Sequence, residues 1–537
     1  MDRMIYNPLE AYTQKLKALH LEKTEQFFEM LTKQSGVNIT ENRATVAEYD
    51  SHTLKLKKQK RKLDWLRVLR VLAIITLVLL PLVFLKLTPK IRALREEIAT
   101  AEEKAAELLA RATAQMEPLC RLCKQEDALR LVEATVPLLT FEPLFSLTKE
   151  TDMKLNYDYR PDAQVRESTL DALSGTYNGN PFVFENKRIQ WMGTETYHGY
   201  KNISWSETYR DSKGQLRRRT RHQTLHATVT KPKPFYKNQV VLSYGAQGGP
   251  ELCFSRDATH LEKKSRWELE RHIDKGERKL KKKANAAVAK NKDFSSMSNT
   301  DFEVLFDALD RNDEVQFRTL FTPLAQTNMT DLILSKDGYG DDFHFIKRNR
   351  MNQIITNHSQ DRHLLLSPQA YCTYSYDSMQ EKYRQAHSEY FKAVYFDFAP
   401  LLAIPIYQER PVHSLKPIPK LAHLYSQKEG EVLANTAGDS CFTHPDTKTQ
   451  AILKTETVDS ADAADVACVT AYSFDTASRV EMVPVFGGDG RMHSVAVNWE
   501  EYLPLEQKNY VSVSEDTEGN KGHVLARKNG LCMLKKQ

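Results

Sequence analysis

Cysteine is scarce in this sequence. The chain has seven cysteines in 537 residues, an odd number scattered along its length. Such a set does not outline a disulfide framework. The low count favours a reducing compartment or an organism that uses few disulfides. Glycine and proline are unremarkable at 20 and 21 residues, so we expect most of the chain to fold.

The sequence also lacks the short motifs that identify common catalytic sites. It contains no Gly-x-Ser-x-Gly elbow, no Walker-type phosphate loop, no His-Glu-x-x-His pair and no Rossmann glycine pattern. An enzyme is therefore not indicated, although an active site dispersed over scattered Ser, His and Asp side chains stays open. No cofactor is predicted.

Long apolar runs are rare as well. The mean hydropathy of −0.54 excludes a polytopic membrane protein. One run is the exception, because residues 71–85 read VLAIITLVLLPLVFL, fifteen uncharged apolar residues in a row. A bilayer core needs about 20 residues, and apolar flanks with long basic side chains extend the run. The pattern predicts one transmembrane helix over 64–87, too far from the N-terminus for a cleaved signal peptide.

Positive charge lies on both sides of this run. Eight lysines and arginines precede it within residues 55–70, and four follow it within residues 86–95. The positive-inside bias places the N-terminus in the cytoplasm and the large domain outside, as in a single-pass protein of the cell membrane. The unpaired cysteines favour the opposite orientation.

Periodicity and punctuation divide the chain into further segments, and Gly36 is the expected end of an N-terminal helix. Strands and helices occur in blocks rather than in strict alternation, which predicts an α+β fold with a β-rich C-terminal part. The predicted segments are a helical cap at 1–50, a basic juxtamembrane linker at 51–63, the transmembrane helix at 64–87, a helical stalk at 88–140, an α+β domain at 141–410 and a β-rich region at 411–537.

The stalk carries a heptad pattern that begins after Thr88-Pro89. Its seam consists of Ile91, Leu94, Ile98, Ala101, Ala105, Leu108 and Ala112. The pattern is compatible with a self-associating coiled coil or with packing against the chain's own domain. Alanine at three of the seven seam positions favours packing within the chain.

A basic hairpin is the most legible candidate for a binding site. If Asp211-Ser212-Lys213-Gly214 forms its turn, Trp205 and Tyr209 lie on one face, and Arg217, Arg219 and Arg221 lie on the other. Three arginines in one strip are able to hold phosphate groups of lipid or nucleic acid. The alternative is an ordinary solvated sheet face.

A second basic patch is predicted on a helix at about 258–292, where Lys281, Lys282 and Lys283 are consecutive. These lysines are further candidates for binding anionic lipid or an anionic polymer. Nucleic acid is not favoured as a partner, because it requires the domain to be cytoplasmic.

Two other groupings suggest metal or redox chemistry only weakly. Cys120 and Cys123 form a single CxxC pair without a second pair nearby. His222 and His226 would share a strand face, but no third ligand is evident. We therefore predict no metal site.

A hairpin is also expected near the C-terminus. Its strands are residues 479–486 and 492–499, its turn is Gly487-Gly488-Asp489-Gly490, and Val495, Val497 and Trp499 share one face.

The stretch Asp301–Leu334, DFEVLFDALDRNDEVQFRTLFTPLAQTNMTDLIL, resembles a segment of an uncharacterised group of bacterial membrane-anchored proteins. There an aromatic-rich helix and an acidic turn precede a Leu-x-Thr-Pro step, here Leu320-Phe321-Thr322-Pro323. The resemblance implies a bacterial membrane location and no known activity.

From the residues we expect a membrane-tethered, non-enzymatic binding or scaffold protein, with a protein partner or self-association through the stalk. The alternatives are a membrane-anchored hydrolase or transferase with a dispersed site, and binding of an anionic polymer or nucleic acid by the basic hairpin.

Overall fold

The computed structural model describes residues 4–75, 87–142, 145–160, 166–210, 212–290, 294–411, 416–419, 425–461, 464–516, 524–528 and 530–535. These residues form an α+β structure with two antiparallel sheets, as the block order of strands and helices predicts. The chain divides into two compact units. One unit is Met1–Leu138 with Leu365–Phe396, and the other is Leu139–Leu364 with Asp397–Gln537.

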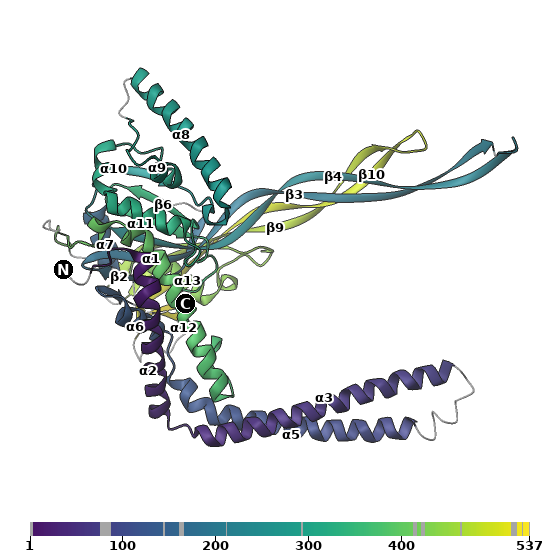
Figure 1. Ribbon diagram of the computed structural model, residues 1–537. Coiled ribbons are helices and arrows are strands. Elements are labelled where there is room, and N and C mark those ends of the chain that lie inside the picture. Colours follow the sequence, from purple (N-terminus) through teal and green to yellow (C-terminus); the bar gives the residue numbers. More distant parts are fainter. Residues whose placement is uncertain are drawn as a thin grey trace. The chain divides into compact units, whose positions relative to one another are not determined.

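The first unit is helical (Figure 1). Gly36 ends the second helix with a left-handed backbone, φ 65°, as the sequence predicts. The helices of this unit are α1 (Pro8–Ala11), the π-helix Tyr12–Leu16, α2 (Lys17–Ser35), α3 (Ile39–Ile75), α5 (Thr88–Leu122), α6 (Asp127–Thr135), the 3₁₀ turn Pro368–Ala370 and most of α12 (Tyr376–Leu402).

Helices α3 and α5 run antiparallel as a long hairpin (Figure 1). Lys60 pairs with Glu102 at 2.7 Å, and Glu41 pairs with Arg111 at 3.1 Å. The earlier of these two α3 residues pairs with the later of the two α5 residues, as an antiparallel arrangement requires. Apolar side chains fill the interface near the end of the hairpin, namely Leu63, Leu66, Leu87, Ile91, Leu94 and Ile98.

The predicted transmembrane helix at 64–87 is wrong as a single membrane-crossing element. No helix in the described part of the chain is long and apolar enough to span a bilayer. Residues 76–86 of the predicted span lie outside the described residues, while residues 64–75 end α3 and Thr88 begins α5. Leu66, within the predicted span, is buried in one cluster with Ile91, Leu94 and Ile98 of α5.

The heptad seam of the predicted stalk packs within the chain. Ile91, Leu94 and Ile98 contact α3, and Leu108 and Ala112 are buried further along α5. Within the predicted stalk segment 88–140, α5 ends at Leu122 and α6 follows at Asp127–Thr135.

In the second unit, a seven-stranded sheet has the order β1-β2-β3-β4-β7-β6-β5. Two of its strands, β3 and β4, extend far beyond the part of the sheet in which they pair with β2 and β7. Strand β3 pairs with β2 only as far as Ile189, and β4 pairs with β7 only from Val241. The strands are β1 (Leu139–Glu142), β2 (Glu167–Tyr177), β3 (Asn180–Arg210), β4 (Leu216–Gly245), β5 (Cys253–Arg256), β6 (Phe343–Arg348) and β7 (Met351–Thr356).

A five-stranded sheet with the order β11-β12-β10-β9-β8 repeats this design. Strand β9 pairs with β8 only up to Tyr472, and β10 pairs with β12 only from Val511. The strands are β8 (Ile452–Ala461), β9 (Ala464–Phe486), β10 (Met492–Glu515), β11 (Val524–Lys528) and β12 (Leu531–Lys535).

Helices of the second unit lie in the connections between strands. Thr322 caps α11 with its side chain, and Pro323 is the first helical residue. The helices are α7 (Leu147–Tyr157), the 3₁₀ turn Leu261–Lys263, α8 (Arg266–Ala289), α9 (Thr300–Phe306), α10 (Glu314–Leu320), α11 (Pro323–Leu334), the 3₁₀ turns Pro405–Gln408 and Asp439–Cys441, and α13 (Gln427–Ala437).

Candidate functional site

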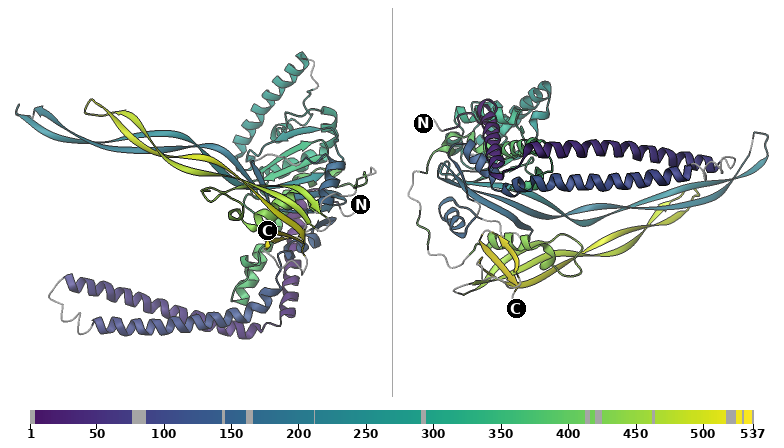
Figure 2. Two further views of the ribbon diagram at one scale, coloured as in Figure 1. Left: turned by 180° about the vertical axis from the view of Figure 1, so that it is seen from behind. Right: turned by 90° about the horizontal axis from the view of Figure 1, so that it is seen from below.

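Two long β-ribbons of the second unit pack together into one arm. The first ribbon is residues 190–240 of β3 and β4, and the second is residues 473–510 of β9 and β10. They run side by side in Figure 1 and in both views of Figure 2. Their shared core consists of Ile203, Leu225, Ala227, Val229, Val495 and Val497. This confirms that Val495, Val497 and Trp499 lie on one face, because Trp499 also packs against this core.

A close backbone contact and several polar contacts hold the ribbons together. A Cβ atom on Gly199 would lie 2.3 Å from the carbonyl oxygen of Ala496, so the strands approach closely only because residue 199 is glycine. Lys231 forms an ion pair with Glu481 at 2.6 Å. At the tip of the second ribbon, the Gly488 amide donates to the side chain of Gln223 at 2.6 Å. The second ribbon therefore ends there, and the first continues beyond it (Figure 1).

The register of the first ribbon differs from the prediction by one residue. Arg210 pairs with Leu216, so five residues rather than four connect the two strands. A slip of one residue moves a strand's side chains to the other face. The predicted separation of the arginines from the aromatic face is therefore wrong. Trp205 lies opposite Arg221, Glu207 opposite Arg219, and Tyr209 opposite Arg217, all on the face that the second ribbon covers further down.

Arg217, Arg219 and Arg221, which we call the arginine strip, are partly neutralised. Glu207 forms ion pairs with Arg219 at 2.8 Å and with Arg221 at 2.5 Å. Hydrogen bonds from Arg221 and then Arg219 lower the pKa of Glu207. The guanidinium of Arg219 also lies 5.1 Å from the centre of the Tyr209 ring. One carboxylate thus serves two arginines, and the strip keeps a net positive charge.

The second ribbon carries a strip of exposed apolar side chains on its outer face. Val480, Met482, Phe486 and Met492, which we call the apolar strip, are each between 59% and 66% exposed. Phe486 lies directly opposite Met492 in the pairing, as the predicted hairpin requires. The intervening Val483 and Val485 point to the first ribbon instead. This alternation places the apolar strip on the side of the second ribbon that faces away from the first.

The two strips face the same side of the arm. The second ribbon lies on the face of the first ribbon that carries the arginine strip, and its tip ends at Trp205 and Gln223. Beyond that tip, the same face of the first ribbon is exposed. The result is a stepped surface with an apolar upper level and a basic lower level.

The three predicted lysines of α8 do not form a common patch. The Lys283 amine donates to the backbone carbonyl of Leu309 and lies 4.1 Å from the centre of the Phe294 ring, and burial and Arg311 lower its pKa. Lys281 pairs with Glu277 at 3.8 Å. Lys282 lines a pocket on another side of the helix. Consecutive positions on a helix point in different directions, which is why the run does not act as one site.

Cys120 and Cys123 meet a third cysteine that sequence spacing did not reveal. Both pack with Cys372 in the aromatic core of the first unit. All three are free thiols, and the described residues contain no group of His, Cys, Asp and Glu side chains arranged to hold a metal ion.

His222 and His226 share a face of β4, as the sequence indicates, but His226 contacts a histidine of the neighbouring strand. His226 Nε2 lies 2.9 Å from Nδ1 of His198, and the two rings are stacked. His222 lies opposite Ser204.

A buried histidine between two carboxylates was not anticipated from the sequence. His358 Nδ1 lies 2.6 Å from Asp342 and Nε2 lies 3.4 Å from Asp397. The hydroxyl of Ser359 donates to Asp397 at 2.8 Å rather than to the imidazole. A nucleophilic serine needs its base within hydrogen-bond reach, and Ser359 has no such contact with His358; the cluster joins Asp397, in the C-terminal part of α12, to the end of β7, both within the second unit. The residues are 16 and 39 positions apart in sequence (358 minus 342, and 397 minus 358), so no motif announces them.

Comparisons of the chain with protein-family models, with curated proteins and with solved structures found no match. The resemblance of Asp301–Leu334 to bacterial membrane-anchored proteins stays a prediction, as does a dispersed catalytic site.

Proposed function

We propose that this chain is a non-enzymatic binding protein that uses the stepped surface of its arm to hold an acidic partner protein. The observation that carries the proposal is the position of the apolar strip and the arginine strip on the same side of the arm. A partner that covers both levels would bury the apolar side chains and neutralise the arginines in one contact.

The apolar strip favours a protein over a nucleic acid as the partner. Contiguous exposed apolar side chains mark protein interfaces. Methionine, aromatic residues and arginine are enriched in such interfaces, and the stepped surface contains all three kinds in Met482, Phe486 and Arg219. Interfaces with nucleic acids are more polar and much more positively charged, so Val480, Met482 and Met492 would remain exposed there.

The basic level predicts the charge of the partner. Residues 206–222 contain six arginines and lysines and two carboxylates, a balance of +4. Complementary charge speeds association and selects among partners. We therefore expect an acidic patch on the partner that faces the arginine strip.

Site-specific photocrosslinking in cells of the source organism tests the proposal. A photoreactive amino acid at Met482 should crosslink one acidic protein, whereas the same residue at Thr224, which is exposed on the opposite face of the first ribbon, should not. The crosslink should disappear in Phe486→Asp and weaken in the double variant Arg219→Glu, Arg221→Glu. With the identified protein purified, binding to the full chain should weaken as salt rises.

Three outcomes would overturn the proposal. They are equal crosslinking at Met482 and Thr224, a crosslink at Met482 that persists in Phe486→Asp, and crosslinking to nucleic acid in place of protein. Hydrogen exchange of the Val495 region shows whether each variant keeps the arm folded.

A further inference from the structure

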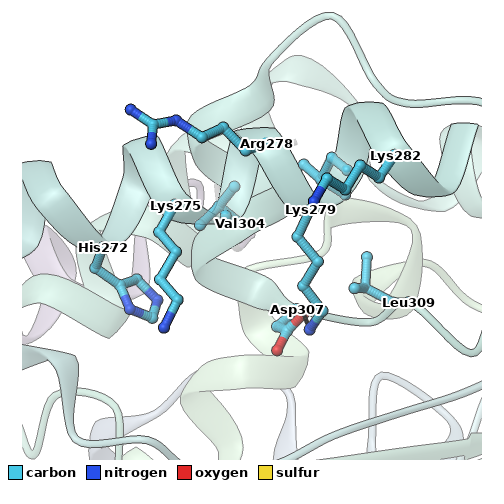
Figure 3. A pocket seen from close by; sticks show the side chains of 10 residues that line it. His272, Lys275, Arg278, Lys279, Lys282, Val304, Asp307 and Leu309 are labelled. Atoms are coloured by element: carbon cyan, nitrogen blue, oxygen red, sulfur yellow. Dashed lines mark ion pairs between the residues drawn. The ribbon is translucent and has the colours of Figure 1, made fainter.

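Helix α8 covers a basic pocket (Figure 3). The three consecutive lysines 281–283 do not predict this pocket. Its volume is about 570 Å³, within the range of small-molecule sites. His272, Lys275, Lys279 and Lys282 line it from one side of the helix, at spacings of three, four and three residues. Such spacings place side chains on one helical face. In Figure 3, His272, Lys275 and Lys279 extend from α8 into the same space.

The pocket has an apolar floor because α8 approaches α9 closely. A Cβ atom on Gly276 would lie 2.3 Å from a methyl carbon of Val304, so glycine permits this contact. Leu280, Val304 and Leu309 line the bottom of the pocket, and Leu280 is almost fully buried. A ligand that fits would thus meet hydrocarbon on one side and cations on the other.

Positive charge in the pocket is largely uncompensated. Four cations line it, Lys275, Arg278, Lys279 and Lys282, and Asp307 is the one carboxylate among the described residues that line it. Lys279 lies 3.8 Å from Asp307. Lys275, Arg278 and Lys282 form no ion pair within the part of the chain that the structure describes. A dianion would offset most of this excess.

The state of His272 fits an anionic ligand as well. Burial and the neighbouring Lys264 lower its pKa. Its imidazole is therefore neutral near pH 7 and is able to donate one hydrogen bond without adding charge.

We propose that this pocket binds a phosphate monoester with an apolar body, the phosphate being held by Lys275 and Lys279 and the body lying against Leu280, Val304 and Leu309. Lysine amines bind phosphate as mobile point charges. The apolar floor distinguishes such an ester from inorganic phosphate, which would leave the floor uncovered. The site is separate from the arm and does not depend on the function proposed above.

Isothermal titration calorimetry on the full chain tests the proposal with phenyl phosphate as the probe. Phenyl phosphate should bind, and inorganic phosphate and benzyl alcohol should bind at least tenfold more weakly, because each lacks one half of the recognised group. The double variant Lys275→Gln, Lys279→Gln should weaken phenyl phosphate binding at least about tenfold. Lys281→Gln is the matched control, since Lys281 lies outside the pocket on the same helix.

Vesicles distinguish a soluble ester from a lipid headgroup. Phosphatidylcholine vesicles with and without phosphatidic acid are compared for co-sedimentation of the chain. Binding of phenyl phosphate assigns a soluble ligand, and binding only to phosphatidic acid vesicles, lost in the double variant, assigns a headgroup. The proposal is overturned if neither probe binds, or if Lys281→Gln weakens binding as much as the double variant does. Circular dichroism checks that the double variant and Lys281→Gln keep the helical content of the wild-type chain.

Discussion

Glu185 and Lys428 form a buried ion pair that joins strand β3 to helix α13, with 3.1 Å between Oε1 and Nζ. A second lysine, Lys187, lies 3.7 Å from the same carboxylate, and the Tyr159 hydroxyl donates to it at 3.1 Å. Burial raises the pKa of Glu185, but the two lysines outweigh burial and lower it to about 2. The carboxylate is thus charged in the folded protein near neutral pH and remains so in mild acid.

Glu185→Gln is expected to destabilise the second unit by about 3–5 kcal/mol at pH 7, because it removes the carboxylate that pairs with buried Lys428, while Lys187 keeps only Glu167 at 3.6 Å. Urea unfolding measures this loss. Glu96→Gln is the control, since its partner Arg92 is exposed and such pairs contribute about 0–1 kcal/mol. Equal stability of the two variants would contradict the argument.

The same carboxylate predicts how stability depends on acid. The folded pKa of Glu185 is lowered from 4.5 to about 2. Its contribution is therefore complete above pH 4.5 and is lost as the pH falls toward 2. The stability of the wild-type chain should fall more steeply over this interval than that of Glu185→Gln, as seen in urea midpoints at pH 5, 4 and 3.

His387 in the first unit changes stability with the same sign as Glu185, but over a higher pH range. Burial and the nearby His20 lower its pKa to about 3, and neither ring nitrogen has a hydrogen-bond partner among the described residues. The unfolded chain takes up a proton near pH 6.5, so stability should be complete above pH 6.5 and fall below it by about 1.4 kcal/mol per pH unit. His387→Phe should flatten this dependence.

At pH 7 His387→Phe should also stabilise the first unit by about 1 kcal/mol, because it removes two unsatisfied buried nitrogens. The ring would keep its contacts with Tyr383 and Tyr371. Hydrogen exchange of peptides from α2 and α12 at pH 7, 6 and 5 measures both effects. An unchanged pH slope would show that another group titrates there.

The sequence predicts elements well where one face is apolar. The hairpin of Phe486 and Met492 follows from its glycine turn and from Val495 and Val497, which fix its register. The first ribbon is polar on both faces near residues 206–220, so alternation there does not distinguish a four-residue turn from a five-residue turn. The stepped surface depends on this difference of one residue, because it places the arginines on the same face as Trp205 and Tyr209.

Local hydropathy also does not distinguish a helix partner from lipid. Leu63 and Leu66 lie in the same kind of sequence whether a bilayer or α5 covers them, and the antiparallel return of the chain decides between them. Similarly, the pocket under α8 depends on the contact between Gly276 and Val304, which are 28 residues apart (304 minus 276). Such a contact is set by tertiary packing and not by spacing in a motif.

The contact between the ribbons predicts a local effect of Gly199→Ala. The added methyl group would meet the backbone of Ala496, and relief requires the ribbons to separate. We expect a loss of about 1–3 kcal/mol in the arm, measured as faster hydrogen exchange near Val495 and Val497. Ser206→Ala is the control, because Ser206 is exposed on the face of the first ribbon that points away from the second ribbon. Unchanged exchange in Gly199→Ala would show that the ribbons do not hold this contact in solution.

The cysteines of the first unit are expected to react slowly despite the CxxC spacing. The hydrogen bond between Cys120 and Cys372, and then burial, raise the pKa of the Cys120 thiol far above its ordinary value. The hydrogen bond with Cys120 lowers the pKa of Cys372. A hydrogen bond with Cys123 and burial outweigh this effect and raise the pKa of Cys372 to about 12. The thiolate is the species that reacts.

With iodoacetamide at pH 8, the exposed Cys441 should therefore be modified at least about tenfold faster than Cys120 or Cys372. Mass spectrometry of timed digests measures the rates, and unfolding in guanidinium should remove the difference. Rapid modification of Cys120 in the folded chain would instead indicate an activated thiol, and with it a redox role for the CxxC pair.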